Sequence, residues 1–419
     1  MRVLFILSQQ PYPWWLYGRS SYYYTLLSLS EFIDVHVSFP VSSIKEEDIT
    51  PLRQKNINPY PYVLDTKDKY YKLLFNLFEM EPFKIRKYWN INYRNFLIQI
   101  TKEIKPDIIQ VHTPHMALYG MELKKIFPEI PIILRPQDIV SQQIETLLNN
   151  SKNPFLNLIA SWQLKKTMKY ETYVWNFYDK VIFLTKSNLK YAKILCAQSN
   201  LLNCDNEGKF LYIMDGVNVK ENLYIRNKNK EDSIAFAASD QLQNVLSLKW
   251  FLNNIWFNIY RETKFKLYIY GKVCEHFKRE ENTLREKKVY LNGFIENKDQ
   301  LDLELSKSKL FISPTTVGSG YRTKILDAGS IGMPVLCTSF DLEPFTDFLK
   351  PNQHILVADT KDEFLEILKK IEYNEISLEK ISHNFYVVLK QEFSWDNTAK
   401  KFLTLYSNLK NTSLQIKDK

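Results

Sequence analysis

Short runs of apolar residues alternate with longer segments of helical periodicity along the whole chain. Runs of four or five apolar residues, such as Val3–Leu7, are typical of strands buried on both faces, because helices cover each side of a parallel sheet. The longer segments repeat apolar residues every three to four positions, which predicts amphipathic helices. The pattern therefore predicts an α/β protein with parallel strands.

The pattern divides into two halves with the same organisation. The strands expected in the first half are Val3–Leu7, Val35–Phe39, Ile108–His112, Ile132–Arg135, Val181–Leu184 and Phe210–Ile213. A polar stretch at Lys220–Asp232 is interpreted as an interdomain linker. The strands expected after it are Ile234–Ala238, Leu267–Tyr270, Val289–Leu291, Leu310–Ser313, Val335–Cys337 and His354–Val357, with helices near Leu246–Arg261, Lys298–Lys307 and Arg322–Ile331. We expect two doubly wound, Rossmann-like domains, residues 1–218 and 219–390, whose carboxyl-end crevices face a central cleft.

Composition limits the class of protein. Four cysteines in 419 residues show no CxxC spacing, which argues against a disulfide framework or a zinc site. The apolar run at the N-terminus is too short for a secretion signal, and no stretch reaches the ~20 apolar residues of a membrane span. These features favour a cytoplasmic protein.

The basic excess is concentrated in one segment. The net charge is +9, and residues 66–105 hold nine Lys and Arg against four Asp and Glu, together with many aromatics. Such a pairing suits an anionic membrane surface, on which the chain would be peripheral, or a nucleic acid. The alternative is two helices with aromatics in the core and solvated lysines, which makes nucleic acid the weaker partner.

Several chemistries are excluded by missing motifs. The first strand is followed by SQQPYPWW rather than GxGxxG, and the chain has no GxxxxGK[ST], HExxH or GxSxG. No convincing DxD pair exists, since Asp302-Leu303-Glu304 lies in a helical pattern and Asp341-Leu342-Glu343 is weak. We therefore expect no metal and no cofactor.

The strongest local signal is FISPTTVGSGYRTKILDAGSIGMPVL, residues 311–336. A strand, a turn at Gly318, Ser319 and Gly320, and a helix from about Tyr321 would form an amide nest at a helix N-terminus, which attracts phosphate. Arg322 and Lys324 oppose the helix dipole there unless an anion lies between them. Asp327 could reach a ribose diol. The alternative is an ordinary strand–turn–helix with solvated basic residues.

At these residues the chain resembles the retaining glycosyltransferases of family 4, which have the GT-B fold. GSGYRTKILDAGSIGMPVL resembles the donor-site segment of that family, and YIMDGVNV is similar to its run at the domain junction. The other pieces that resemble the family, in the family's order, are PDIIQVHTPH, DKVIFLTKSNLKY, NVLSLKWFLNNIW and FSWDNTAKKFLTLY. The last of these implies that residues 391–419 form a closing helix that crosses back onto the N-terminal domain.

The resemblance implies an enzyme of the hexosyltransferase type. A nucleotide-diphosphate sugar, as co-substrate, would bind the C-terminal domain, and a glycan, lipid-linked or protein acceptor would bind the N-terminal domain, as in polysaccharide biosynthesis. Without a metal, the diphosphate would depend on Arg322, Lys324 and the helix N-terminus. The other residues carried over are Gly293, Phe294 and Ile295 for the base, His112 beside the reaction centre, Gly18 and Arg19 near the phosphates, and His115 and Asp138 on the acceptor side.

The chain also departs from the family pattern. The two glutamates of the family's E-x7-E pair correspond to Ser319 and Asp327, and the usual basic pair after the first C-terminal strand is missing from AASDQLQN. These losses keep two alternatives open. One is a catalytically silent GT-B partner or chaperone subunit, and the other, less favoured, is a GT-B enzyme that modifies DNA bases.

Overall fold

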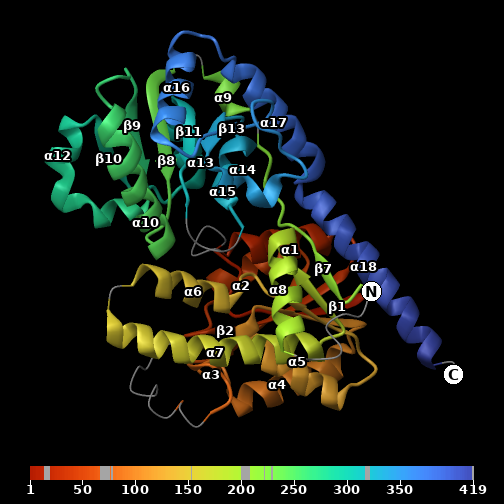
Figure 1. Cartoon of the computed structure of the whole chain (residues 1–419). Coiled ribbons are helices and arrows are strands. Elements are labelled where there is room, and N and C mark those ends of the chain that lie inside the picture. The colour runs from red at the N-terminus through yellow and green to blue at the C-terminus, as the bar shows by residue number, and fades with distance from the viewer. Residues whose placement is uncertain are drawn as a thin grey trace. The chain divides into compact units, whose positions relative to one another are not determined.

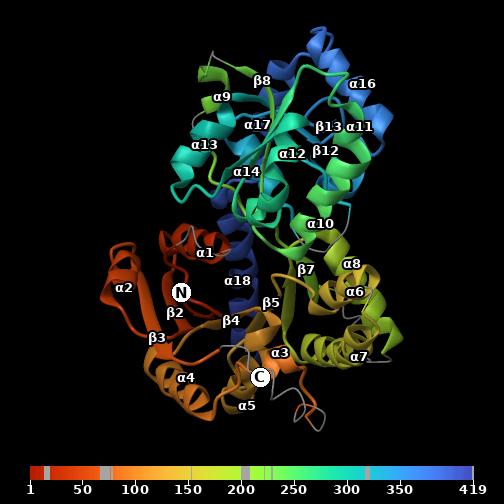
Figure 2. The same ribbon diagram turned by 90° about the vertical axis from the view of Figure 1, so that its left-hand side faces the viewer.

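The computed structural model describes residues 1–13, 19–66, 76, 79–151, 153–199, 208–220, 222–227, 230–316 and 321–417. The chain forms two compact units (Figures 1 and 2). Unit 1 comprises Met1–Gly216 and Trp395–Lys419, and unit 2 comprises Val217–Ser394. Each unit is described by itself below, so a cleft shared between the domains stays a prediction.

The sheet of unit 1 has the order β3-β2-β1-β4-β5-β6-β7, and every strand pair is parallel. Its strands are β1 (Arg2–Ile6), β2 (Asp34–Val41), β3 (Ile57–Val63), β4 (Ile108–His112), β5 (Ile132–Arg135), β6 (Lys180–Phe183) and β7 (Phe210–Tyr212). The sequence pattern does not predict β3, because Pro59 and Pro61 interrupt it. Its position at the edge of the sheet tolerates them, since the outer side of an edge strand needs no N–H donors.

Helices cover both faces of this sheet. They are α1 (Ser20–Ser30), α2 (Glu46–Arg53), α3 (Phe83–Arg86), α4 (Ile91–Ile104), the 3-10 turn η3 (Pro114–Met116), α5 (Ala117–Ile126), α6 (Val140–Asn150), α7 (Pro154–Phe177), α8 (Lys186–Gln198) and α18 (Trp395–Lys417).

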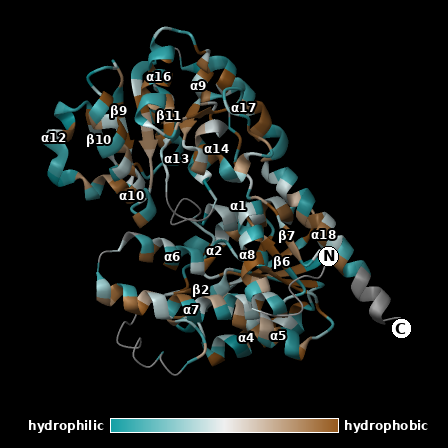
Figure 3. Cartoon of the chain, in the orientation of Figure 1, coloured by the Kyte–Doolittle hydropathy of each residue, from teal (hydrophilic) through white to brown (hydrophobic). Residues whose placement is uncertain are grey.

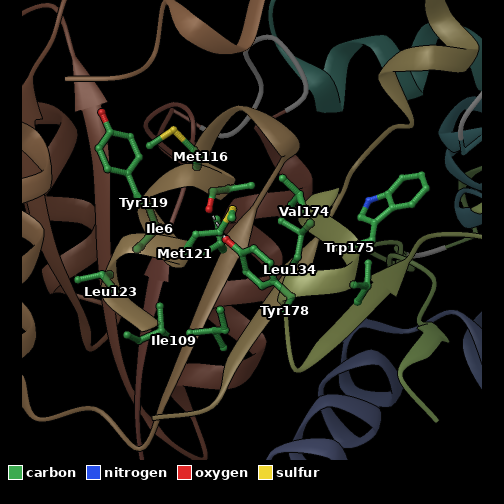
Figure 4. Packing of buried hydrophobic residues seen from close by; sticks show 14 of the residues in the cluster. Ile6, Ile109, Met116, Tyr119, Met121, Leu123, Leu134, Val174, Trp175 and Tyr178 are labelled. Atoms are coloured by element: carbon green, nitrogen blue, oxygen red, sulfur yellow. Dashed lines mark hydrogen bonds between the residues drawn. The ribbon is translucent and has the colours of Figure 1, made fainter. Parts of the chain in front are cut away.

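Alternate residues of β1 enter two separate cores, which explains its unbroken apolar run. Leu4 and Ile6 pack with Ile109 and other residues in the core drawn in Figure 4, whereas Val3 and Phe5 pack in a core on the opposite face, which the C-terminal helix α18 joins. The α18 side chains in that second core are Ala399, Phe402 and Tyr406, none of which is exposed. The C-terminal helix α18 therefore completes a core to which the first strand also contributes.

Unit 2 has a six-stranded sheet of order β10-β9-β8-β11-β12-β13, also parallel throughout. Its strands are β8 (Glu231–Ala237), β9 (Lys266–Tyr270), β10 (Val289–Gly293), β11 (Ser308–Ser313), β12 (Val335–Cys337) and β13 (Leu356–Val357). The predicted fold class, two doubly wound parallel-sheet domains, is thus confirmed. Figure 3 shows the contrast between brown strands and the hydrophilic outer helices such as α12.

The helices of unit 2 differ from the prediction mainly at the first predicted helix. They are α9 (Leu223–Arg226), α10 (Leu242–Phe251), the π-helical segment η4 (Leu252–Trp256), α11 (Phe257–Ile259), the 3-10 turns η5 (Lys272–His276), η6 (Lys278–Glu280) and η7 (Glu343–Phe345), α12 (Glu281–Glu286), α13 (Lys298–Ser306), α14 (Thr323–Ser330), α15 (Ser339–Leu342), α16 (Lys361–Glu372) and α17 (Leu378–Glu392). The helix expected at Leu246–Arg261 begins earlier and changes its winding at Leu252.

The linker expected at Lys220–Asp232 is a wrong prediction, because this stretch is built into unit 2. Asn222 caps α9, and the buried Tyr224 donates to the Lys309 carbonyl at 3.1 Å. Lys220 forms ion pairs with Asp299 and Asp302. The polar composition of this stretch is typical of a linker, but these polar groups form hydrogen bonds and ion pairs within unit 2.

Candidate functional site

Each sheet has a topological switch point, where the strand order reverses direction. In unit 2 the reversal lies between β8 and β11, and in unit 1 it lies between β1 and β4. Helices on either side of a switch point leave a crevice at the carboxyl ends of the strands, which is where open α/β sheets bind ligands. The predicted residues Arg322 and Lys324 follow β11, and His112 ends β4.

Arg322 is held by a buried carboxylate. Its Nε donates to Asp341 Oδ1 at 2.9 Å, and its guanidinium lies 4.9 Å from the centre of the Phe340 ring. Asp341 is fully buried and accepts two further hydrogen bonds, from the Ser313 hydroxyl and from the Thr315 N–H at 3.1 Å. Asp341 thus connects the end of β11 to the start of α14. The ion pair with Asp341 neutralises part of the charge of Arg322.

Lys324 has a different environment. Its ammonium donates to Asn244 Oδ1 at 3.1 Å and to Thr315 Oγ1 at 3.2 Å, both neutral oxygens. Burial lowers the pKa of Lys324 to about 8, with the Arg322 charge acting in the same direction and Asp341 opposing. Among the described residues no carboxylate forms an ion pair with it. Lys324 is therefore a half-buried cation that contacts neutral oxygens and lies 5.5 Å from the centre of the Phe236 ring, with Asp341 as a more distant source of negative charge.

The predicted base-binding residues lie at the carboxyl end of the edge strand β10, which β9 separates from β8. Gly293 has a φ of +73°, and its carbonyl accepts from the Gly271 N–H at 2.7 Å. Phe294 is 53% exposed, and the Lys272 ammonium lies 5.3 Å from the centre of its ring. An exposed aromatic face beside a backbone turn is suited to stacking with a planar ring. Ile295 follows, half-buried.

Asp327 lies on α14 and faces a charged cluster. Burial raises the pKa of Asp327, and Lys298 and Lys220 lower it. Both lysines pair with Asp302, which is 1% exposed. The predicted turn residues Gly318, Ser319 and Gly320, and also Gly18, lie outside the described residues, so the amide nest stays a prediction.

In unit 1, His112 is buried and neutral. Burial and the nearby Arg135 charge lower the pKa of His112 well below its ordinary value. Tyr406 of α18 donates to Gln110 Oε1 at 2.6 Å, which leaves the Gln110 amide nitrogen to donate to His112 Nε2 at 2.8 Å. With this assignment the imidazole hydrogen is on Nδ1. The Gln137 amide nitrogen, which lies 3.5 Å from Nδ1, is itself a donor and therefore does not accept this hydrogen.

The backbone directly after His112 has an unusual conformation. Thr113 has a φ of +70°, a region that non-glycine residues rarely occupy, and its N–H donates to the Arg135 carbonyl at 3.0 Å. Backbone strain of this kind is concentrated at functional sites. Together with the position at the switch point, it favours a functional role for His112.

The other predicted residues of unit 1 are more loosely grouped. Arg19 donates to the Tyr12 carbonyl at 3.5 Å at the start of α1. His115 packs against Tyr88, with ring centres 5.0 Å apart. Asp138 is half-buried and follows Gln137, whose amide donates to the Ser21 hydroxyl at 3.1 Å. A shared role of His115, Asp138 and His112 stays a prediction.

Sequence reasoning missed four residues of these networks. Asn244, Thr315 and Asp341 organise the two cations of unit 2, and Arg135 lies fully buried beside Asp215, 2.6 Å away. One signal was present for Asp341: a carboxylate within an apolar context after β12 needs a cationic partner. Nothing in the sequence singles out Asn244, which lies about 80 residues from Lys324.

The C-terminal unit matches a known family. Residues 231–372 match the family model described as glycosyl transferases group 1. This segment is similar to domains of that family, which confirms the expectation of a group 1 glycosyltransferase; the assignment to family 4 stays a prediction. No curated protein matches the chain.

Solved structures of similar fold cover nearly the whole chain. The Anabaena protein Alr3699/HepE in complex with UDP has a TM-score of 0.62 and 14% identity, over 97% of this chain and 100% of that one. Sucrose-phosphate synthase from Thermosynechococcus elongatus has a TM-score of 0.67 and 12% identity, over 98% and 99%. The apo lipopolysaccharide outer core galactosyltransferase WaaB has a TM-score of 0.60 and 14% identity, over 100% of both chains. The fold is GT-B.

Among the residues that the structure describes, no helix is long and apolar enough to span a bilayer. Within the same residues, no group of three or more His, Cys, Asp or Glu side chains has an arrangement that could hold a metal ion.

Proposed function

We propose that the chain is a metal-independent, retaining glycosyltransferase of family 4 that uses a nucleotide-diphosphate sugar. The acceptor would be a glycan, a lipid-linked glycan or a protein, as in polysaccharide biosynthesis. The observation that carries this proposal is the partly buried Lys324 ammonium beside the end of β11, which forms no ion pair with a described carboxylate. The Anabaena protein of similar fold was solved in complex with UDP, which makes uridine diphosphate the first nucleotide to test.

The proposed chemistry is electrostatic. As the bond between sugar and diphosphate breaks, negative charge grows on the leaving phosphate. Lys324 would bind that phosphate, and the Arg322 guanidinium, held in place by Asp341, would add positive charge beside it. Phe294 would stack on the base, and Asp327 would accept from the ribose. Partial burial of Lys324 strengthens its interaction with the developing charge, because the local dielectric is low.

On the acceptor side, His112 would contact the transferred sugar. Its Nδ1–H is the one imidazole donor, because Nε2 is occupied by Gln110. A neutral imidazole that is fixed in one tautomer can donate a hydrogen bond to a sugar oxygen without adding a positive charge. We also propose that the protein acts in the cytoplasm as a peripheral membrane protein, with residues 66–105 toward an anionic surface.

The alternative of a silent partner rests on Ser319 and Asp327, which replace the family's two glutamates. Lys324 argues against a silent partner. A partly buried cation that forms no ion pair destabilises the fold, and its presence is explained if an anionic ligand neutralises it.

The test is a thermal-shift panel of nucleoside diphosphates and their sugars on the full chain. We expect one nucleotide to raise the melting temperature, because a ligand that binds only the folded state stabilises it. Lys324→Ala should abolish the shift. Lys249→Ala, on an exposed position of α10, is the matched control and should retain it.

The pH dependence adds a second readout. Since the pKa of Lys324 is about 8, nucleotide affinity should fall as the pH rises from 7 to 9, by up to about tenfold per pH unit above the pKa. In Lys324→Arg the side chain stays charged, so the affinity should be nearly constant over this range. A panel without any nucleotide-dependent shift would favour the silent partner.

A further inference from the structure

The last helix of the chain contributes one buried polar group to the surroundings of His112. Tyr406 of α18 is fully buried, and burial raises the pKa of its phenol, so the hydroxyl keeps its hydrogen. This hydroxyl donates to Gln110 Oε1 at 2.6 Å and has no other hydrogen-bond partner in the part of the chain that the structure describes. Gln110 is also fully buried, on β4, and its amide nitrogen lies 2.8 Å from His112 Nε2. Side chains from two distant parts of the sequence thus form one chain of hydrogen bonds.

Tyr406 determines which way the Gln110 amide points. A phenol has one hydrogen to donate, and the amide oxygen of Gln110 is its acceptor. If the amide were reversed, the phenol hydrogen would be buried without an acceptor, which is unfavourable. The amide nitrogen therefore donates to His112 Nε2. Because burial lowers the pKa of His112 and keeps the imidazole neutral, its one hydrogen is on Nδ1.

The other side of the imidazole favours the opposite tautomer. The amide nitrogen of Gln137 lies 3.5 Å from Nδ1, so a second donor lies beside the ring. This nitrogen also donates to the Ser21 hydroxyl at 3.1 Å, whereas the Gln137 oxygen is 3.4 Å from that hydroxyl. A neutral imidazole accepts at one nitrogen only, and Gln137 alone would place the hydrogen on Nε2. The contacts through Gln110, at 2.6 and 2.8 Å, are shorter and determine the tautomer.

Packing holds the imidazole in place. The Tyr22 ring lies edge-on to it, with ring centres 5.5 Å apart, and the Phe5 ring packs at 6.0 Å. The Nδ1–H of His112 therefore has no acceptor among the described residues. The next residue, Thr113, is 7% exposed, and its hydroxyl has no hydrogen-bond partner in the same part of the chain. Buried polar groups are normally paired, so these two indicate a ligand that supplies the missing partners.

We propose that Tyr406 is a positioning residue for sugar transfer: through Gln110 it keeps the His112 hydrogen on Nδ1, where an oxygen of the sugar accepts it. The role of the sugar rests on the proposed function, whereas the tautomer follows from the contacts alone. A sugar oxygen at Nδ1 relieves the conflict between the two donors, because the ring hydrogen then has an acceptor that the free protein does not provide.

The test is nitrogen NMR of the full chain with isotope-labelled histidine, because ring nitrogens with and without a hydrogen have well-separated chemical shifts. The His112 signals are those that are missing from the spectrum of His112→Gln. In the wild type we expect the hydrogen on Nδ1. Tyr406→Phe removes only the hydroxyl, so the Gln110 amide is free to reverse, and the hydrogen should move to Nε2.

The matched control is Tyr178→Phe, which removes the hydroxyl of another buried tyrosine of unit 1. Tyr178 donates to the Ala117 carbonyl at 2.7 Å and has no contact with His112 among the described interactions. This variant should keep the wild-type tautomer. Melting curves confirm that each variant folds.

Sugar transfer provides a second readout, measured as release of nucleoside diphosphate from the nucleotide sugars of the thermal-shift panel. Tyr406→Phe should lower kcat by about tenfold, the effect of about one hydrogen bond, and should leave the nucleotide-induced rise in melting temperature unchanged. An unchanged tautomer in Tyr406→Phe, the same tautomer change in Tyr178→Phe, or a changed tautomer with unchanged kcat would each overturn the proposal. If the wild type releases no nucleotide, the proposed function fails, and the nitrogen spectra alone decide whether Tyr406 sets the tautomer.

Discussion

At the scale of single residues, the two cations of the candidate donor site are not equivalent. Arg322 is paired with a carboxylate that itself has three donors, whereas Lys324 contacts neutral oxygens and the face of the Phe236 ring. A buried ion pair organises its surroundings, and an unpaired cation is available for a ligand. Arg322 and Asp341 therefore act mainly as positioning residues for the loop after β11, and Lys324 is the residue that faces the proposed phosphate.

This division predicts different results for two aspartates of unit 2. Asp341→Asn should lower the free energy of unfolding by about 3 kcal/mol, because it leaves Arg322 as a buried cation without a counter-ion. Asp362→Asn is the control, since Asp362 is 88% exposed and should contribute within about 0.5 kcal/mol. Urea unfolding measures both. Equal unfolding midpoints for the two variants would contradict the positioning role of Asp341.

The sequence contained part of this site and not the rest. Arg322 and Lys324 could be identified because two cations at a helix N-terminus conflict with the helix dipole. Which of them is neutralised could not be predicted, since Asp341 follows a different strand and Asn244 lies near the first helix of unit 2. Contacts between residues far apart in sequence depend on the packing of the sheet, which local patterns do not encode.

At the scale of elements, the predictions were best where burial is complete. The strands β4, β5 and β12 have the expected bounds, because a central strand of a parallel sheet is buried at every position and its sequence is therefore mostly apolar. The edge strand β3 was missed, and the polar stretch around Tyr224 was interpreted as a linker. In both segments, polar residues or prolines have a structural role in the fold, whereas the same residue types in a sequence are typical of loops.

The buried carboxylate of Glu171, on α7, contacts the start of α6, and its titration makes the stability of the fold depend on pH. Glu171 of α7 accepts from the Val140 N–H at 2.7 Å and from Ser141, and so caps the start of α6. Burial nevertheless raises the pKa of Glu171 from 4.5 to about 7. The folded state therefore binds this proton more tightly than the unfolded state, and stability contributed by the protonated form is lost as the pH rises from about 4.5 to 7.

We expect Glu171→Gln to remove this pH dependence. Between pH 5 and 7 the wild type should lose up to about 1.4 kcal/mol per pH unit relative to the variant, and above pH 7 the difference should stay constant. Urea unfolding at a series of pH values measures the difference. Glu47→Gln, on the exposed face of α2, should show the wild-type slope. Parallel curves for wild type and Glu171→Gln would show that Glu171 titrates normally.

At the scale of the whole molecule, the first and last parts of the chain form one folding unit. The closing helix α18 supplies Phe402, whose ring lies 4.6 Å from the Arg135 guanidinium, and Tyr406, which fixes the His112 tautomer through Gln110. The Thr398 hydroxyl also donates to the Met214 carbonyl at 3.2 Å. Residues nearly 300 positions apart thus determine the chemistry at the end of β4.

This arrangement makes unit 1 depend on the end of the chain. A chain that ends at Ser394 lacks Ala399, Phe402 and Tyr406, and the loss of each large buried side chain costs about 3–5 kcal/mol, which together exceeds or matches the stability of an ordinary domain. Amide hydrogen exchange should then show loss of protection in β1 and β4, while β8 and β11 of unit 2 remain protected. A chain that ends at Asn411 retains all three residues and should protect β4 like the full chain. Because the two truncated chains differ by only 17 residues of the same helix, full protection of β4 in the shorter one would mean that α18 lies on unit 1 without stabilising it.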